Sequence, residues 1–367
     1  MKNPINSTSK WKNATLKDLV FFQRGFDITK AEQSEGNIPV ISSSGITSYH
    51  TKEMVNGPGV IIGRKGTLGT VFYSKSDYWP HDTTLWSKNL KNNNPRFVYY
   101  FIKTLRLENY NVGNANPILN RNHIHSLKIR IPEDGEQEKI ASILSSYDDL
   151  IDTNRRRIQL LEEAARLLFR EWFVYFRFPG HEKVKIVDGL PEGWKKEPLI
   201  LIWDIRYGSN LPTTMIQPFG KYPVFGADSI IGFYEKCNVE DNVCLVTCRG
   251  NGSGNVRRTF GAGFVTNNSF IFKSKIEYSY IPFFFTMFII ANLKLNNHIT
   301  GSAQPQLTLS NISGLKVLIP TKHLILQFTE IVENLFIESD NLRSQNQKLA
   351  QARDLLLPRL MSGAIEV

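Results

Sequence analysis

The sequence has few of the features that mark secreted, membrane or disulfide-rich proteins. Its 367 residues include three cysteines, Cys237, Cys244 and Cys248, which cannot form a fully paired disulfide framework and so favour a reducing compartment. Residues 1–12 are polar and lack the apolar stretch of a signal peptide. The longest apolar run, residues 281–291, is far shorter than the ~20 residues that span a membrane. We therefore expect a cytoplasmic protein with no membrane partner.

Motifs for nucleotide, metal or nucleophilic chemistry are also missing. There is no Gly-x4-Gly-Lys-Ser/Thr loop for ATP, and no glycine-rich turn between a strand and a helix for S-adenosylmethionine. The segment after Asn94 lacks the second proline of the base-holding motif of amino-methyltransferases, so a turn or helix start is favoured. Cys244 and Cys248 lack further ligands for zinc and are predicted as core. We interpret His123 and His125 as structural, and expect no catalytic residue, metal or cofactor in this chain.

Positive charge is what the sequence has in excess. Lys and Arg number 44 and Asp and Glu 34, a formal net charge of +10. Residues 1–135 carry a net +8 and residues 191–320 a net +4, while residues 136–190 and 321–367 carry −1 each. Two basic blocks joined by a neutral spacer suit a long polyanion such as duplex DNA. A generally basic chain with solvated lysines is the alternative that charge alone leaves open.

The sequence contains an internal repeat that divides it into two similar halves. Matching residues recur at an offset that grows from 183 to 188 along the chain: Trp11 and Trp194, Pro39 and Pro223, Arg64 and Arg249, Gly69 and Gly254, Pro117 and Pro305, Leu161 and Leu349. A drift in one direction is what small loop insertions produce, whereas chance matches would scatter. The period predicts duplication of a whole domain together with the helix that follows it.

Each unit combines short strands with one long helix. Apolar runs at residues 60–62, 70–73, 243–246 and 270–272 are typical of strands, and each block closes with a strand that ends at Pro132 or Pro320. Apolar or small residues then recur every three or four positions, which predicts two amphipathic helices. We call the apolar stripe along each predicted helix its seam. The seam of the first helix consists of Ile140, Ile143, Tyr147, Leu150, Asn154, Ile158, Leu161, Ala165, Leu168 and Trp172. The seam of the second consists of Ile331, Leu335, Glu338, Leu342, Gln345, Leu349, Ala352, Leu356 and Leu360.

These patterns predict an α+β protein in which two similar mixed α/β domains are separated by two long antiparallel helices, with an internal pseudo-twofold repeat. The expected bounds are residues 1–135 for the first domain, 136–176 for the central helix, 177–320 for the connection and second domain, and 321–367 for the C-terminal helix that pairs with the central one. Asn154, in the first seam, either fixes the register of the pair or is partly exposed, and the exposed position is favoured.

Loops rich in glycine and small polar residues recur at matching places in both basic blocks. Glycine lets the backbone approach a phosphate or base edge, while Arg reads guanine and Asn reads adenine. For any single residue an ordinary hairpin turn is favoured, but for the loops as a set, recurrence in both domains favours DNA contact. The predicted DNA-binding residues are Ser43, Ser44, Tyr49, Arg64, Lys65, Thr67, Asn114, Asn116, Asp228, Tyr234, Arg249, Asn251, Ser253, Arg257, Arg258, Ser302, Gln304 and Gln306.

Four segments resemble parts of one protein family. The central helix of type I restriction–modification specificity subunits strongly resembles residues 143–157, ILSSYDDLIDTNRRR, and 160–174, LLEEAARLLFREWFV. The start of that family's second recognition domain is similar to residues 189–194, GLPEGW, and its C-terminal tail to residues 355–365, LLLPRLMSGAI. The resemblance covers the whole chain, and is specific in the helices and weak in the recognition domains.

Because the recurring loops differ between the two halves, we expect the two domains to read different half-sites of a bipartite, asymmetric duplex DNA target. The resemblance implies a non-catalytic subunit with two target recognition domains. It implies assembly with two modification (methylase) subunits and with restriction (translocase and nuclease) subunits, so that S-adenosylmethionine, ATP and Mg²⁺ belong to those partners. It also implies that the helices dock the methylase subunits, with Arg155, Arg156, Arg157 and Trp172 as candidate contacts. For the arginine cluster, simple solvation is the alternative.

Two other functional classes stay open from the sequence. A stand-alone DNA methyltransferase or nuclease would bind S-adenosylmethionine or cleave DNA by itself. A coiled-coil scaffold or an RNA-binding protein would not retain duplex DNA in a sequence-selective, salt-sensitive way.

Overall fold

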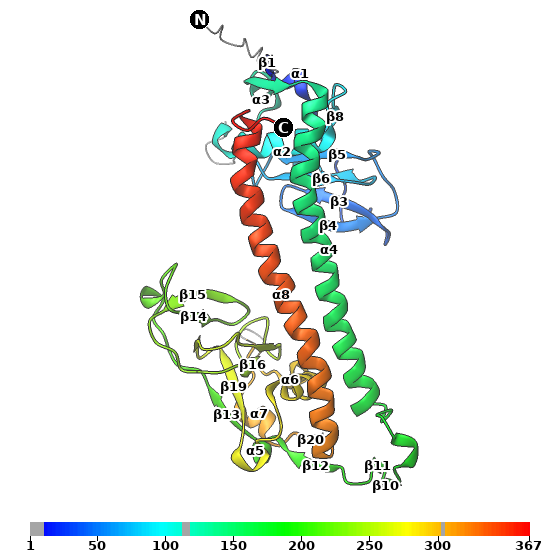
Figure 1. The fold of residues 1–367 in the computed structure, drawn as a ribbon, viewed down its shortest axis with the longest axis vertical. Helices are drawn as coiled ribbons and strands as arrows, with labels where there is room; N and C mark the ends of the chain where they lie inside the picture. The colour runs from blue at the N-terminus through cyan, green and yellow to red at the C-terminus, as the bar shows by residue number, and fades with distance from the viewer. Residues whose placement is uncertain (1–10, 112–117, 302–304) are drawn as a thin grey trace, which may run out of the picture. The chain divides into compact units, whose positions relative to one another are not determined.

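The computed structural model describes residues 11–111, 118–301 and 305–367. The chain forms two compact units, one of residues 1–155 with 343–367 and one of residues 156–342. Two helices of 40 residues each, α4 (Asp134–Phe173) and α8 (Lys322–Met361), contribute a part to each unit (Figure 1). The helices end each half of the repeat, as the apolar periodicity predicts.

The first unit contains a four-stranded sheet of order β2-β8-β5-β6, a three-stranded sheet β4-β3-β7 and the pair β1-β9. Its strands are β1 (Trp11–Thr15), β2 (Phe21–Arg24), β3 (Ile38–Ser42), β4 (Gly45–His50), β5 (Gly59–Gly63), β6 (Val71–Ser74), β7 (Trp79–Pro80), β8 (Thr84–Asn89) and β9 (Lys128–Pro132). Its short helices are α1 (Leu16–Leu19), α2 (Pro95–Thr104), η1 (Leu107–Tyr110) and α3 (Arg121–His125).

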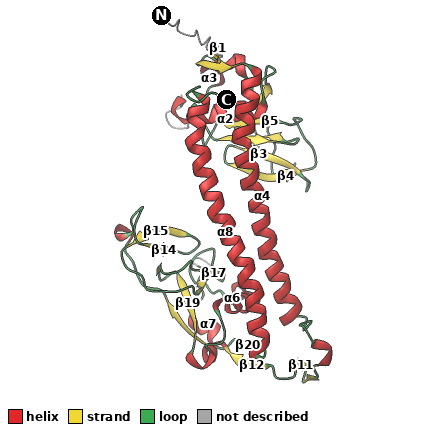
Figure 2. Ribbon diagram, in the orientation of Figure 1, coloured by secondary structure: helices red, strands yellow, loops and turns green. Residues whose placement is uncertain are grey.

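The second unit repeats this plan, with sheets β13-β19-β16-β17, β15-β14-β18 and β12-β20 (Figure 2). Its strands are β10 (Ile186–Val187), β11 (Leu190–Pro191), β12 (Lys195–Pro198), β13 (Trp203–Tyr207), β14 (Tyr222–Phe225), β15 (Ile230–Tyr234), β16 (Cys244–Thr247), β17 (Val256–Arg258), β18 (Phe264–Val265), β19 (Ser269–Ser274) and β20 (Lys316–Ile319). Its short helices are η2 (His181–Lys183), α5 (Leu199–Ile202), η3 (Thr213–Met215), η4 (Ile276–Tyr278), α6 (Phe283–Asn292), η5 (Leu295–His298) and α7 (Leu309–Ser313). The three sheets correspond strand for strand, which confirms the predicted duplication.

The central strands and the helix that covers them follow from local sequence. Every residue of β5 and β16 is buried, as expected for continuous apolar runs inside a sheet. Helix α2 starts where Asn94 accepts hydrogen bonds from the backbone N–H groups of Arg96 (3.0 Å) and Phe97 (3.1 Å), and Pro95 occupies its first turn. The interpretation of Asn94 as a helix start is thus confirmed.

The buried face of α8 in the second unit differs from the predicted seam. Ile331 is 43% exposed, whereas Phe328, Val332 and Phe336 are buried. Phe328 lies 5.8 Å, ring to ring, from Phe169 of α4 and meets further aromatic rings of α6. The predicted seam was wrong here because large aromatic side chains, rather than the evenly spaced aliphatic ones, determine which face of the helix is buried.

Asn154 is only 1% exposed in the first unit, so the favoured interpretation of an exposed position was wrong. Its side-chain amide donates to Asn346 of α8 at 3.0 Å, and Asn346 in turn donates to the Ile151 carbonyl at 3.5 Å. Asp148 pairs with Arg353, so partner numbers fall as numbers rise and the two segments are antiparallel within this unit. A buried amide needs a partner, so this pair disfavours other registers.

Among the residues that the structure describes, no helix combines the length and apolar character needed to cross a membrane.

We predict that Phe328→Ala lowers the free energy of unfolding by about 3–5 kcal/mol, because it leaves a cavity among buried rings. The matched control is Ile331→Ala on the exposed side of the same helix, for which a change within about 0.5 kcal/mol is expected. Urea unfolding of the full chain, followed by tryptophan fluorescence, measures both. Equal losses in the two variants would contradict the buried face described above.

Candidate nucleic-acid interface

A glycine-rich loop follows the central strand of each domain. In the first domain the Gly69 N–H donates to the Gly63 carbonyl at 3.0 Å, and in the second the Gly254 N–H donates to the Thr247 carbonyl at 2.8 Å. Gly69 and Gly254 both have positive φ, 73° and 89°, which glycine adopts without strain. The loops therefore close in the same way although their sequences differ.

Arg64 is held by its backbone at the start of the first loop. Its N–H donates to the Thr83 carbonyl at 2.8 Å, and its carbonyl accepts from the Leu119 N–H at 2.9 Å. Both polar groups of the main chain are thus satisfied by neighbouring segments, whatever the side chain is. The side chain is half-buried, and its Nη1 donates to the Asp82 carbonyl at 3.3 Å.

In the second domain the residue with this backbone environment is Cys248, which bonds to Asn268 at 2.8 Å and Leu307 at 2.9 Å. The structure therefore matches Arg64 with Cys248. The sequence alignment of Arg64 with Arg249 was wrong by one residue, because the second loop is one residue longer between its closing hydrogen bonds.

Lys65 and Arg249 are the true counterparts. Lys65 forms a β-bridge with Ile118, and Arg249 forms one with Gln306. Both are exposed. Each domain therefore presents one exposed basic side chain at the same point of its loop.

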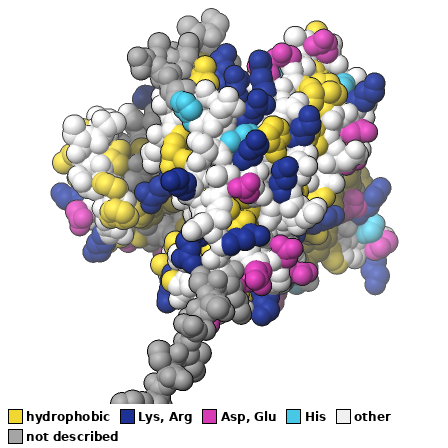
Figure 3. Space-filling view, turned by 90° about the horizontal axis from the view of Figure 1, so that it is seen from above, with side chains coloured by type: hydrophobic (Ala, Val, Ile, Leu, Met, Phe, Trp, Pro, Cys, Tyr) yellow, Lys and Arg dark blue, Asp and Glu magenta, His cyan; other side chains and the backbone are white. Residues whose placement is uncertain are grey.

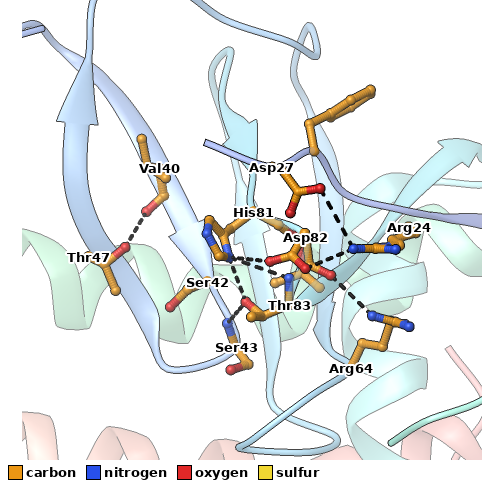
Figure 4. Close-up of polar contacts among 12 residues, drawn as sticks. Arg24, Asp27, Val40, Ser42, Ser43, Thr47, Arg64, His81, Asp82 and Thr83 are labelled. Carbon is orange, nitrogen blue, oxygen red and sulfur yellow. Dashed lines mark hydrogen bonds and ion pairs between the residues drawn. The ribbon is translucent and has the colours of Figure 1, made fainter. Parts of the chain in front are cut away.

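A polar cluster that the sequence did not reveal lies beside the first loop (Figure 4). The Asp82 carboxylate is 2.9 Å from Arg24 Nη2 and 3.0 Å from His81 Nδ1. Arg24 also approaches Asp27 at 3.8 Å. Arg24 is the last residue of β2, and Asp82 lies in the turn before β8. Nothing in the sequence indicates that Arg24 and Asp82 are neighbours, because only the pairing of β2 with β8 brings them together.

Three arginines, Arg24, Arg64 and Arg121, line a cavity of about 320 Å³ in the first unit, together with Asn120 and Asn122. Partial burial lowers the pKa of the Arg64 guanidinium from its ordinary value, and the positive charge of Arg24 acts in the same direction. The cavity is therefore basic and offers several N–H donors to an anion or to the edge of a base.

The predicted DNA contacts differ widely in exposure. Ser43 and Ser253 are buried, and the half-buried members are Arg64, Tyr234, Arg257, Arg258 and Gln306. The exposed members are Ser44, Tyr49, Lys65, Thr67, Asp228, Arg249 and Asn251. Asn114, Asn116, Ser302 and Gln304 lie outside the described residues.

Three of the predicted contacts have partners within the second unit. Ser253 Oγ donates to the Gly250 carbonyl at 2.7 Å, and Arg257 Nη2 donates to the Gly226 carbonyl at 2.6 Å. Burial lowers the pKa of Arg257. Arg258 has a 9% exposed side chain and pairs with Asp340 of α8 at 2.5 Å. These three side chains stabilise the fold, and we leave them out of the proposed interface.

The arginine cluster of α4 is exposed. Arg155 pairs with Asp152 at 3.1 Å, and Arg157 pairs with Glu338 of α8 at 2.9 Å. Trp172, which we expected beside them as a docking residue, is 7% exposed and packs against other rings of the second unit's core. It is therefore also left out of the proposed docking surface.

Cys244, Cys248 and His125 are buried, which agrees with the structural roles predicted for them. Cys244 and Cys248 are fully buried, and burial raises the pKa of both thiols, that of Cys248 to about 11. His125 Nε2 accepts a hydrogen bond from the Phe22 N–H at 3.0 Å. Among the described residues, no group of three or more His, Cys, Asp or Glu side chains is placed to hold a metal ion.

Basic side chains are spread over the face drawn in Figure 3, interspersed with fewer acidic ones. This agrees with the net charge of +10 and with a polyanionic partner.

Comparison with known proteins assigns the family. A family model described as the type I restriction modification DNA specificity domain matches residues 8–163 and again residues 191–349. The chain belongs to this family. The two matches cover the two halves of the repeat, so the chain is a type I specificity subunit with two such domains.

Individual relatives agree with this assignment. The MjaIX specificity subunit of a type I restriction enzyme from Methanocaldococcus jannaschii is 25% identical over 311 residues, covering 74% of this chain and 69% of the relative. A putative type I specificity subunit of Mycoplasma pneumoniae is 26% identical over 328 residues, covering 83% and 84%. The crystal structure of a type I S subunit from M. genitalium has a TM-score of 0.65 and 19% identity, covers 98% of both chains, and so shows the same fold.

We predict that Arg258→Leu lowers the free energy of unfolding by about 2 kcal/mol, somewhat less than the loss for a fully buried pair because Asp340 is partly exposed. Arg249→Ala, the matched loss of an exposed arginine in the same domain, is expected to change it by less than about 0.5 kcal/mol. Urea unfolding curves of both variants provide the measurement. A stable Arg258→Leu chain would return Arg258 to the candidates for DNA contact.

Proposed function

We propose that this specificity subunit is itself non-catalytic and that each of its recognition domains reads one half-site of a bipartite, asymmetric duplex target. One observation carries the proposal. The two domains share a backbone frame, by which we mean the hydrogen bonds made by the N–H and carbonyl groups of Arg64 in one domain and of Cys248 in the other. The side chain at this position differs between the domains. A frame that is constant while its side chains differ is suited to reading two different half-sites. The exposed Lys65 and Arg249 are proposed to contact DNA in both domains.

Membership of the type I restriction modification specificity family supports a division of labour within a larger complex. Two modification subunits are proposed to supply adenine methylation with S-adenosylmethionine, and restriction subunits to supply ATP- and Mg²⁺-dependent translocation and cleavage. The cytoplasm, where these cofactors and duplex DNA meet, is the proposed place of action.

The long helices are proposed to separate the two recognition domains, to pair along their length and to dock the modification subunits. Within the first unit Asn154 and Asn346 join the helices, and within the second Arg157 and Glu338 do so. The exposed cluster of Arg155, Arg156 and Arg157 is the proposed docking contact. A helix of 40 residues is about 60 Å long, against about 34 Å for one turn of DNA.

Mapping methylated adenines across the source genome, with and without this gene, tests the proposed function. The expected result is one bipartite motif, with two unlike half-sites and an unread spacer, that disappears when the gene is deleted and returns when it is restored. Methylation that persists without the gene, or DNA cleavage or S-adenosylmethionine binding by the purified chain alone, would contradict the proposal.

We also predict that the helices set the spacer length. Seven residues added to each helix, between Arg155 and Arg156 and between Leu342 and Arg343, lengthen both by about 10 Å while nearly preserving their faces. The mapped motif is then expected to gain about three base pairs of spacer, since one base pair rises about 3.4 Å. Unchanged half-sites serve as the internal control, and an unchanged spacer would exclude a rigid ruler.

A further inference from the structure

The polar cluster of Arg24 and Asp82 lies in the first domain. The pairing of the strands identifies the residues that correspond to it in the second domain. Arg24 pairs with Leu85, the second residue of β8, and Tyr207 pairs with Phe270, the second residue of β19. Tyr207 therefore occupies the position of Arg24. By the same count Asn267, two residues before β19, occupies the position of Asp82, two residues before β8.

The first domain thus has a charged set at this place and the second a neutral one. Arg24, Arg64 and Asp82 correspond to Tyr207, Cys248 and Asn267. The Tyr207 ring packs against the Phe270 ring in a tilted arrangement, with a centroid distance of 4.6 Å. The frame is common to both domains, so the difference lies in the chemistry presented to a ligand.

Intramolecular contacts hold the Arg24 side chain in place but leave about half of it exposed to solvent. Its side chain is 52% exposed, and its Nη2 is held 2.9 Å from the 18% exposed Asp82 carboxylate. Because a guanidinium has five N–H donors in a planar fork, fixing one edge on a carboxylate orients the remaining donors. His81 Nδ1 lies 3.0 Å from the second oxygen of Asp82 and forms an ion pair with it when the imidazole is protonated.

Arg24 differs from Arg64 and Arg121 of the same cavity in having two carboxylates beside it, which favour a neutral acceptor over a phosphate at this one guanidinium. Asp82 and Asp27 both lie within 4 Å of Arg24, so a phosphate placed on this guanidinium would face two carboxylates. The O6 and N7 atoms of guanine are uncharged acceptors that match the arginine fork. At Arg24 itself the two carboxylates therefore favour a base edge over a phosphate.

We propose that Arg24 reads a guanine in the half-site bound by the first domain, and that Asp82 is the positioning residue that orients it. This rests on the proposed function, since it presumes that the domain binds duplex DNA. It adds that the two half-sites differ at this point because the second domain carries Tyr207 and Asn267 there.

Methylation mapping in cells that carry Arg24→Ala tests the proposal with the intact complex. One guanine of one half-site is expected to become degenerate, while the other half-site stays as in the wild type. Lys88→Ala, which removes an exposed positive charge from β8 in the same sheet, is the matched control and leaves the motif unchanged. An unaltered motif in Arg24→Ala cells, or a wild-type half-site without guanine, would overturn the proposal.

If cells that carry Arg24→Ala show no methylation of the target, DNA binding by the purified full-length chains tests the proposal. Duplexes carrying the mapped target are made with 7-deazaguanine, which lacks the N7 acceptor, at each guanine in turn. One such replacement is expected to weaken wild-type binding by about 10-fold and to leave Arg24→Ala binding unchanged. Loss of affinity by Arg24→Ala for all duplexes alike, with a salt slope lower by about one, would assign Arg24 to a phosphate and overturn the proposal.

Asp82→Asn separates positioning from contact. Discrimination between the target and its deaza form is expected to fall several-fold in this variant, and the double variant with Arg24→Ala is expected to lose no more than Arg24→Ala alone. Additive losses would show that Asp82 acts independently of Arg24. A wild-type chain that gives no bipartite motif and selects no duplex would instead refute the proposed function, which is a different result from any of these.

Discussion

The backbone hydrogen bonds at Arg64 and at Cys248 are the constraint on which the recognition domains depend. At each position the N–H group and the carbonyl group are both bound by neighbouring segments, at 2.8 and 2.9 Å in each domain. Main-chain groups make these bonds, so no particular side chain is required to maintain the loop. The frame can therefore persist while a charged arginine in one domain is replaced by a buried cysteine in the other.

Many polar side chains of both units form hydrogen bonds or ion pairs with other residues of the protein. Arg257 and Arg258 look like DNA-binding residues in the sequence, yet they bond to Gly226 and Asp340. Asn154 is buried and bonds to Asn346. Burying a polar group without a partner is costly, so each of these contacts constrains the fold. Lys65 and Arg249 are exposed at equivalent points and are the simplest pair to assign to DNA.

Much of the architecture could be predicted because it depends on local patterns. The strands, the two long helices, the repeat and the buried cysteines follow from short-range periodicity and composition. The register of the loops could not be predicted, because one extra residue between Thr247 and Gly254 shifts the match. The buried face of α8 was missed because Phe328 and Phe336 outweigh the aliphatic spacing that includes Ile331. Arg24 and Asp82 were missed because 58 positions separate them and only strand pairing joins them.

The most direct test exchanges the side chains on the constant frame. A chain carrying Arg24→Tyr, Arg64→Cys and Asp82→Asn presents the second domain's side chains in the first domain, and its methylated motif can be mapped in cells. The account predicts that the half-site of the first domain changes while the second half-site and the spacer stay the same. An unchanged motif, or a change confined to the other half-site, would contradict it.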